Sequence, residues 1–204
     1  MPSNNSKILV PSVYCLPVQE RELKGNASNS LDIYRAVKTM RAIRQFEKKN
    51  VDPVVIERIL ESGRWAGSAK NVQPWNFIVV TDRQTLNYLA ECGKYTSHLR
   101  EAPLAIIIVT PPIPHADFDS GRAAQNMMLT AWKYGVGSCI GTIHEQARAK
   151  KALGIPEGFE IRQAISFGYP RPVVELTIEG KPLKDVLASL GRKPIDELVH
   201  SEKW

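Results

Sequence analysis

The stretch LAIIIV, which runs from Leu104 to Val109, decides the fold. Pro103 interrupts the chain directly before it, and its β-branched residues suit a strand that is buried on both faces. The stretch is far shorter than the roughly 20 apolar residues that a membrane-spanning helix needs. We therefore expect a strand inside a globular domain and no membrane-spanning segment.

Further helices and strands are predicted on both sides of this strand. The spacing of apolar residues predicts helices that begin near residue 31 and after Asp52-Pro53, helices over 83–92, 118–134 and 144–153, and strands over 76–80 and 161–167. The glycine-rich GVGSCIG at 135–141 is expected to lead into one more short strand. Helices alternate with strands, but consecutive strands need not be neighbours, so α/β and α+β architectures both remain open.

The composition is that of one ordinary soluble domain. The chain has 204 residues, of which 43% are apolar and 24% charged, and this excludes wholesale disorder. Residues 1–30 carry prolines and a polar run without lasting periodicity, so we interpret them as an N-terminal arm and 31–204 as the domain. The three cysteines form no CxxC pair and no signal peptide is apparent, which favours a cytoplasmic protein without disulfides or bound metal.

The basic charge balance indicates an anionic ligand. The formal net charge is +6, but no block of five or more basic residues occurs, so nucleic acid is not the expected partner. Arg41 and Arg44 lie three apart where the first helix ends, a spacing that lets two guanidinium groups converge on one phosphate. The same two residues also fit a solvated helix end, where cations are favourable.

A second candidate site is the loop from Gly67 to Trp75. It holds a hydroxyl, an ammonium group, two amides and an indole within nine positions. Such a loop is able to wrap a planar heterocycle, whose edge the amides and backbone N–H groups would bind. The alternative is a polar connection in which Asn71 forms a turn and Trp75 enters the core.

Conventional catalytic motifs are missing from the sequence. GVGSCIG lacks the third glycine of a dinucleotide-binding fingerprint, because Ile140 stands there, and it follows a helix rather than a strand. No GxSxG, HExxH or P-loop occurs, and the four histidines show no metal-ligand spacing. Cys139 is interpreted as a buried small residue rather than a nucleophile. A reactive group would therefore have to come from a cofactor.

Five stretches, in this order along the chain, resemble the nitroreductase family of flavin enzymes. They are MRAIRQF at 40–46, SAKNVQPWNFIVV at 68–80, AAQNMMLTAWKYGVGSCIG at 123–141, FGYP at 167–170 and GRKPIDELVHSEKW at 191–204. The resemblance implies an α+β fold with a mixed central sheet flanked by helices. It also implies an intertwined homodimer that binds one FMN at each of two sites between the subunits.

The resemblance assigns FMN-binding roles to several residues near the N-terminal half of the domain. Arg41 and Arg44 match the family's arginines near the FMN phosphate and ribityl chain, and Ala42 stands where many members have serine. Ser68, Ala69 and Asn71 match residues of the family's FMN-binding loop, which relatives supply from the partner subunit. In this loop Gly67 replaces the family's proline.

The remaining assignments lie in the second half of the chain. Gly141 and Thr142 match positions where relatives line the face and edge of the flavin ring, largely by backbone. Arg192 and Lys193 match terminal basic residues that close over the phosphate. No residue is assigned a catalytic role of its own, because the flavin carries the redox chemistry.

The function implied by the resemblance is that of an FMN-dependent oxidoreductase. It would take a hydride from NADH or NADPH and reduce nitroaromatics, quinones or related electron-poor acceptors in ping-pong turnover. Relatives that dehalogenate substrates or fragment flavin leave the acceptor open. The alternative is a flavin-binding protein without nicotinamide turnover, such as a flavin carrier or a nucleic-acid accessory.

Overall fold

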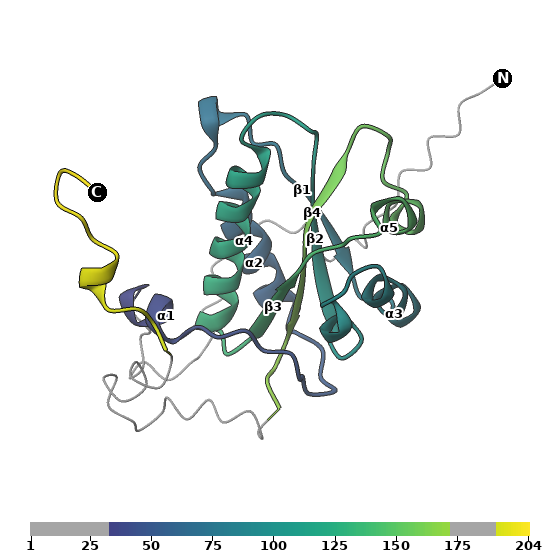
Figure 1. Ribbon diagram of the computed structural model, residues 1–204. Coiled ribbons are helices and arrows are strands. Elements are labelled where there is room, and N and C mark those ends of the chain that lie inside the picture. Colours follow the sequence, from purple (N-terminus) through teal and green to yellow (C-terminus); the bar gives the residue numbers. More distant parts are fainter. Residues whose placement is uncertain (1–32, 172–190) are drawn as a thin grey trace.

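A four-stranded sheet lies at the centre of the molecule (Figure 1). The structure, a computed structural model, describes residues 33–171 and 191–204. The strands are β1 (Asn76–Val80), β2 (Leu104–Thr110), β3 (Gly137–Gly141) and β4 (Glu160–Gly168). Their spatial order is β1-β2-β4-β3, so the last strand in sequence is inserted between two earlier ones.

The predicted strand at 104–109 is confirmed as β2, and every one of its residues is buried. It pairs antiparallel with β1 on one side and with β4 on the other. Ile106 and Ile108 pack in one apolar cluster and Ala105 and Ile107 in another, on the opposite face of the sheet. Burial on both faces accounts for the continuous apolar run, because neither side of the strand meets water.

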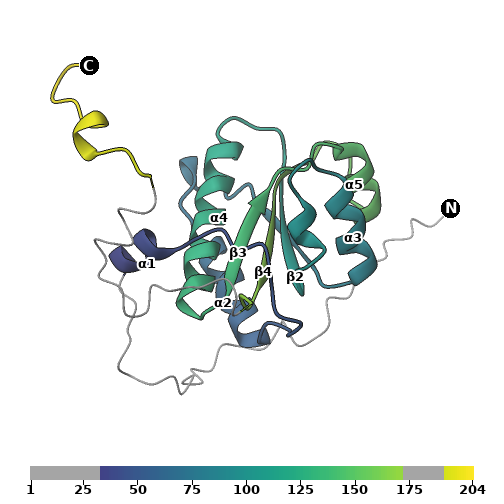
Figure 2. The ribbon, with the colours of Figure 1, turned by 60° about the horizontal axis from the view of Figure 1, so that its bottom comes forward.

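Helices cover both faces of the sheet. They are α1 (Ile33–Thr39), α2 (Pro53–Arg64), α3 (Arg83–Glu91), α4 (Ala116–Lys133) and α5 (Gln146–Leu153). Figures 1 and 2 show α2 and α4 on one face and α3 and α5 on the other. Three single-turn 3-10 helices complete the described chain: η2 (Ala69–Asn71), η3 (Ser97–Leu99) and η4 (Ile195–Glu197).

The predicted start of α2 is confirmed in its cap. The Val54 backbone N–H donates to Asp52 Oδ1 at 2.8 Å, and Pro53 occupies the first helical position. The first backbone N–H groups of a helix have no partner inside the helix. The Asp52 side chain accepts from one of them, and Pro53 has no N–H that needs a partner.

The expected α+β class is confirmed, with one refinement and one shift. The expected mixed sheet is wrong for the described strands, which all pair antiparallel; the parallel pairing seen in the described residues is an isolated bridge between Ala42 and Ser138. The strand expected after GVGSCIG instead comprises its last five residues, as β3. Pairing with β4 on one side supplies this glycine-containing segment with strand hydrogen bonds that local propensity did not predict.

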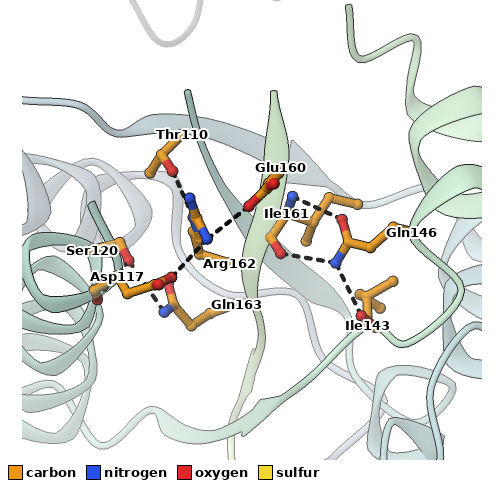
Figure 3. A network of polar contacts seen from close by, with 9 residues as sticks. All are labelled: Thr110, Asp117, Ser120, Ile143, Gln146, Glu160, Ile161, Arg162 and Gln163. Carbon is orange, nitrogen blue, oxygen red and sulfur yellow. Dashed lines mark hydrogen bonds and ion pairs between the residues drawn. The ribbon is translucent and has the colours of Figure 1, made fainter. Parts of the chain in front are cut away.

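Polar side chains join β4 to the elements around it (Figure 3). The Arg162 side chain donates to Thr110 Oγ1 at 2.7 Å, and its guanidinium pairs with Asp117 and Glu160, each at 2.8 Å. The Gln146 side chain bonds both the backbone N–H and the carbonyl of Ile161, each at 3.0 Å. These contacts fix the register of β4 against the start of α4 and of α5.

Two further expectations concern membrane-spanning helices and the N-terminal arm. Within residues 33–171 and 191–204 no helix has the length and apolar character needed to cross a bilayer. The expected N-terminal arm, residues 1–30, lies outside the described residues, as does the expected first turn of the first helix at residue 31.

Candidate functional site

Arg41 and Arg192, which lie 151 positions apart in sequence, come together in the structure. Arg41 follows α1, and its Nη1 donates to the carbonyl oxygens of Lys38 at 2.9 Å and Met40 at 2.7 Å. Its Nη2 is buried and has no hydrogen-bond partner within the described residues. Burial lowers the pKa of Arg41, and the positive charge of Arg192 lowers this pKa further. A buried donor beside a second cation favours the binding of an anion.

Arg44 lies in a different setting, along the edge strand β3. The Ile43 backbone N–H donates to the Ser138 carbonyl at 2.8 Å, which holds this segment against the strand. The neighbouring Ala42 is exposed and offers no hydroxyl. From this position the Arg44 guanidinium interacts with Cys139 and His98. The structure thus groups Arg41 with Arg192, and Arg44 with β3.

Cys139 is buried, as its sequence environment predicted. Burial raises the pKa of its thiol above the ordinary value, although Arg44 acts in the opposite direction. The group is therefore a protonated thiol at neutral pH, which agrees with its interpretation as a packing residue rather than a nucleophile.

His98, in η3, forms a buried polar network with Ser166 and Cys139. His98 Nδ1 lies 2.7 Å from Ser166 Oγ, and this hydroxyl donates to the Cys139 carbonyl at 3.3 Å. Because the Ser166 hydroxyl donates its hydrogen to the Cys139 carbonyl, its oxygen accepts a hydrogen bond from His98. We therefore assign the ring proton of His98 to Nδ1, which leaves Nε2 as an acceptor. Nε2 is buried without a hydrogen-bond partner in the described part of the chain. Burial, and after it the charge of Arg44, lowers the pKa of His98 to about 4, so the ring is neutral at neutral pH.

Gly141 ends β3 directly against this imidazole. A Cβ atom at residue 141 would lie 2.9 Å from His98 Nε2 and 2.9 Å from Thr96 Cγ2, closer than real side chains approach. Glycine is therefore the residue that fits here, and His98 fixes the position of its backbone. Thr142, which follows, is exposed. Of the two residues predicted to line the flavin, Gly141 thus lies against His98, whose ring also senses the charge of Arg44.

The loop that holds Ser68, Ala69 and Asn71 is fastened to the start of α4. Ser68 Oγ accepts from the Gln73 backbone N–H at 2.9 Å. The Ala69 backbone N–H donates at 3.1 Å to Oδ2 of Asp119, a buried carboxylate in the first turn of α4. Gly67, which replaces the family's proline, therefore precedes a loop that is held by hydrogen bonds at both ends.

This loop also carries unusual backbone conformations. Lys70, Asn71 and Gln73 all have positive φ, at 51°, 56° and 51°. In residues other than glycine such conformations cost of the order of 1–3 kcal/mol each, and they cluster at ligand-binding sites. The alternative interpretation is confirmed in part, because Trp75 is buried in the hydrophobic core. A polar connection alone does not explain why three residues with positive φ lie within four positions.

The loop with Ser68 and the segment that leads to Arg41 lie at opposite ends of α4. The loop with Ser68 contacts Asp119 near the start of this helix, whereas Thr39, close to Arg41, accepts from Trp132 Nε1 at 3.1 Å near its end. Asp119 and Trp132 are thirteen positions apart in the helix, about 20 Å along the axis. Figure 1 shows α1 beside the end of α4 that leads into β3. One copy of the chain therefore holds these predicted site residues in two separate groups, which we call the half-sites.

Sequence reasoning missed several residues of these half-sites. His98 and Ser166 lie 68 positions apart, and no spacing rule connects them. Asp119 was hard to single out from the sequence, because an acidic residue in the first turn of a helix is common. Its burial, which is unusual for a carboxylate, is seen only in the structure. Among the described residues no group of three or more His, Cys, Asp or Glu could hold a metal ion.

Comparison with known proteins places these observations in a family. The model of the nitroreductase family matches residues 37–94 and 90–169. Two archaeal proteins named as candidate NADH dehydrogenases/NAD(P)H nitroreductases are similar to this chain. The one from Archaeoglobus fulgidus is 32% identical over 180 residues, and the match covers 83% of this chain and 97% of the relative. The one from Methanothermobacter thermautotrophicus is 30% identical over 185 residues, and the match covers 86% of this chain and 90% of the relative.

A solved structure extends the likeness to three dimensions. The FMN-dependent nitroreductase of Clostridium difficile R20291 superposes with a TM-score of 0.68 at 25% identity. The match covers 83% of this chain and 98% of that one.

Proposed function

This chain belongs to the nitroreductase family, and from that premise we propose that it is an FMN-dependent oxidoreductase. We propose NADH or NADPH as the reductant and nitroaromatics, quinones or related electron-poor compounds as acceptors. The names of the two archaeal relatives support the activity, and that of the Clostridium difficile structure supports the cofactor.

The observation that carries the proposal is the pairing of Arg41 with Arg192. A buried guanidinium N–H without an acceptor and a neighbouring cation are both unfavourable in the free protein. A phosphate supplies the missing acceptor and removes the repulsion, so these residues fit the phosphate end of FMN. Lys193, exposed next to Arg192, adds a further charge at the same place.

The residues near β3 fit the redox end of the cofactor. Bound FMN would supply the chemistry, which is the acceptance of a hydride from the nicotinamide and its transfer to the acceptor. Gly141 and Thr142 would offer backbone groups to the ring, with the Gly141 backbone held in place by His98. Arg44 would supply positive charge on this side, which favours an anionic reduced cofactor. No side chain has to act as acid or base.

We further propose that the protein works as a homodimer. Within one copy the loop with Ser68 and Asn71 lies at the other end of α4 from Arg41, so these two groups of residues do not meet in one copy. A second copy arranged in the opposite direction would place its loop beside the first copy's Arg41 and Arg192. This arrangement also explains why a strained loop is kept on the surface.

An anaerobic spectroscopic titration tests the proposed activity. The purified protein should be yellow, NADH or NADPH should bleach the flavin absorbance, and a nitroaromatic or a quinone should restore it. If dithionite bleaches the protein but neither nicotinamide does, the alternative of a flavin-binding protein without nicotinamide turnover holds. A colourless protein that also fails to bind added FMN would contradict the proposal.

The phosphate assignment is tested by Arg41→Ala. We expect FMN to bind at least about tenfold more weakly, because one charge-assisted contact is worth roughly 1.5–3 kcal/mol. Lys151→Ala, which removes an exposed cation from α5, is the matched control and should retain FMN as the wild type does. The measurement is the dissociation constant of FMN by fluorescence quenching, with circular dichroism to confirm folding. Wild-type affinity in Arg41→Ala would refute the assignment.

A further inference from the structure

A cavity of about 390 Å³ lies at the end of β4 that leads out of the sheet, apart from the residues assigned to FMN. Its nine lining residues come from four segments of the chain: Glu47, Lys48, Lys49, Asn50, Arg83, Arg100, Glu101, Pro103 and Arg171. We call it the basic cavity. Its volume falls within the range of about 300–1,000 Å³ that is usual for small-molecule sites.

The lining of the basic cavity is strongly positive. Five of the nine residues are cationic and two are anionic, and Pro103 is the one apolar member. Within the described residues neither Lys48 nor Lys49 forms an ion pair with a carboxylate, and the Lys49 ammonium instead lies over the Tyr169 ring at 4.5 Å. Arg100 pairs with Glu91 and Arg171 with Glu101, so the cations left facing the cavity are Lys48, Lys49 and Arg83, with Glu47 as the remaining carboxylate of the lining. Such a concentration of charge attracts a multiply charged anion.

Two of the arginines are held in place before any ligand binds. Arg171 donates from Nε to the Phe46 carbonyl at 2.9 Å and pairs with Glu101 at 2.8 Å. Arg83 donates from Nη1 to the Arg100 carbonyl. These bonds restrict both side chains, so less conformational entropy is lost when a ligand binds. Each guanidinium keeps further N–H donors for an oxyanion.

We propose that the basic cavity binds a small polyvalent phosphate anion, at a site distinct from that of FMN. The charge and the fixed arginines recognise the phosphate groups. None of the nine lining residues is aromatic, which argues against a nucleotide base as the main contact, since bases bind largely by stacking on aromatic side chains. The ligand class is therefore a compact phosphate compound such as a pyrophosphate.

Calorimetric titration of the FMN-loaded protein with inorganic pyrophosphate tests this proposal. We expect saturable binding with one pyrophosphate per chain. Affinity should fall at least about tenfold in Lys48→Ala/Arg83→Ala, which corresponds to roughly 1.4 kcal/mol. Lys48→Ala alone, which removes no hydrogen bond or ion pair found among residues 33–171 and 191–204, should weaken binding in the same direction. Lys151→Ala should bind as the wild type does, and the FMN content should be equal in all variants.

Several results would overturn the proposal. One is the absence of saturable binding, and another is equal pyrophosphate affinity in the wild type and the double variant. Loss of FMN from the double variant would show that the cations serve the flavin phosphate instead. Adenosine monophosphate is the comparison ligand, and tighter binding of this nucleotide than of pyrophosphate would reject the compact phosphate as the ligand class.

Discussion

His98 is a buried imidazole whose neutral state is built into its surroundings. Its ring contacts the backbone of Gly141 and its Nδ1 lies against Ser166, while the positive charge of Arg44 lies nearby. Protonation would place a second cation in this buried position. The ring therefore supports the flavin-side backbone as a neutral group, and its titration is linked to folding.

The linkage predicts a loss of stability in mild acid. The unfolded chain takes up a proton at the ordinary histidine pKa near 6.5, whereas the folded protein does so only at about pH 4. The free energy of unfolding should therefore decrease as the pH falls through this interval, by up to about 3 kcal/mol from His98. Urea denaturation at several pH values should show a smaller decrease in His98→Gln than in the wild type.

The exposed His200 supplies the control for this measurement. His200→Gln should reproduce the pH dependence of the wild type. The same slope in His98→Gln as in the wild type would show that His98 does not titrate as the structure indicates.

The residue scale also shows what local sequence can reveal. Spacing and the family resemblance predict Arg41 as a phosphate ligand; the structure adds that Arg192 lies near it, and phosphate binding itself stays a prediction. The partnership of His98 with Ser166 was invisible, because it depends on how η3 packs against the sheet. Long-range contacts of isolated polar residues leave no periodic pattern in a sequence.

Among the elements, β4 depends on polar side chains for its position. Arg162 is nearly buried and joins β2, α4 and its own strand through Thr110, Asp117 and Glu160 (Figure 3). Without the guanidinium, two carboxylates would face each other across the vacated space. The cost of a change here thus includes the repulsion as well as the lost hydrogen bonds.

We predict that Arg162→Ala lowers the free energy of unfolding by about 2 kcal/mol, the value of a charge-assisted hydrogen bond. Adding Glu160→Gln should recover part of this loss, because one of the two facing charges is removed. Urea denaturation at a fixed protein concentration measures both effects. No recovery in the double variant would contradict the role assigned to carboxylate repulsion.

Elements with a strong pattern were predicted well. Strand β1 has the bounds expected from sequence, and β2 and β4 differ from theirs by one or two residues at the ends. Strand β3 was misplaced because glycine has low strand propensity and the pairing with β4 decides the outcome. Hydrophobic patterns therefore identified the strands that bury apolar side chains. They did not locate β3, whose position depends on its pairing with β4.

On the scale of the whole molecule, apolar side chains are exposed where a second copy is expected. Ile33, Tyr34 and Val37 of α1 are more than half exposed, and so are Ile195 and Leu198 near the C-terminus. Exposed apolar patches of this kind mark protein interfaces. They support the homodimer proposed from the separated half-sites.

The dimer is tested by Ile195→Glu/Leu198→Glu. Two charges in an apolar interface should shift the protein toward monomer and, because each FMN would need both copies, release FMN as well. Analytical ultracentrifugation measures the first effect and flavin absorbance the second. Tyr95→Glu, at an exposed aromatic residue outside the C-terminal segment, is the control. A variant that remains dimeric would exclude this segment from the interface.

The order β1-β2-β4-β3 has a consequence for synthesis on the ribosome. Strand β2 can pair with β1 early, but its other edge stays open until β4 emerges some fifty residues later, and β3 has no sheet to join before then. An apolar strand with a free edge readily adds foreign strands. We therefore expect newly made chains to rely on chaperones during this interval, and slow translation between β3 and β4 to favour aggregation.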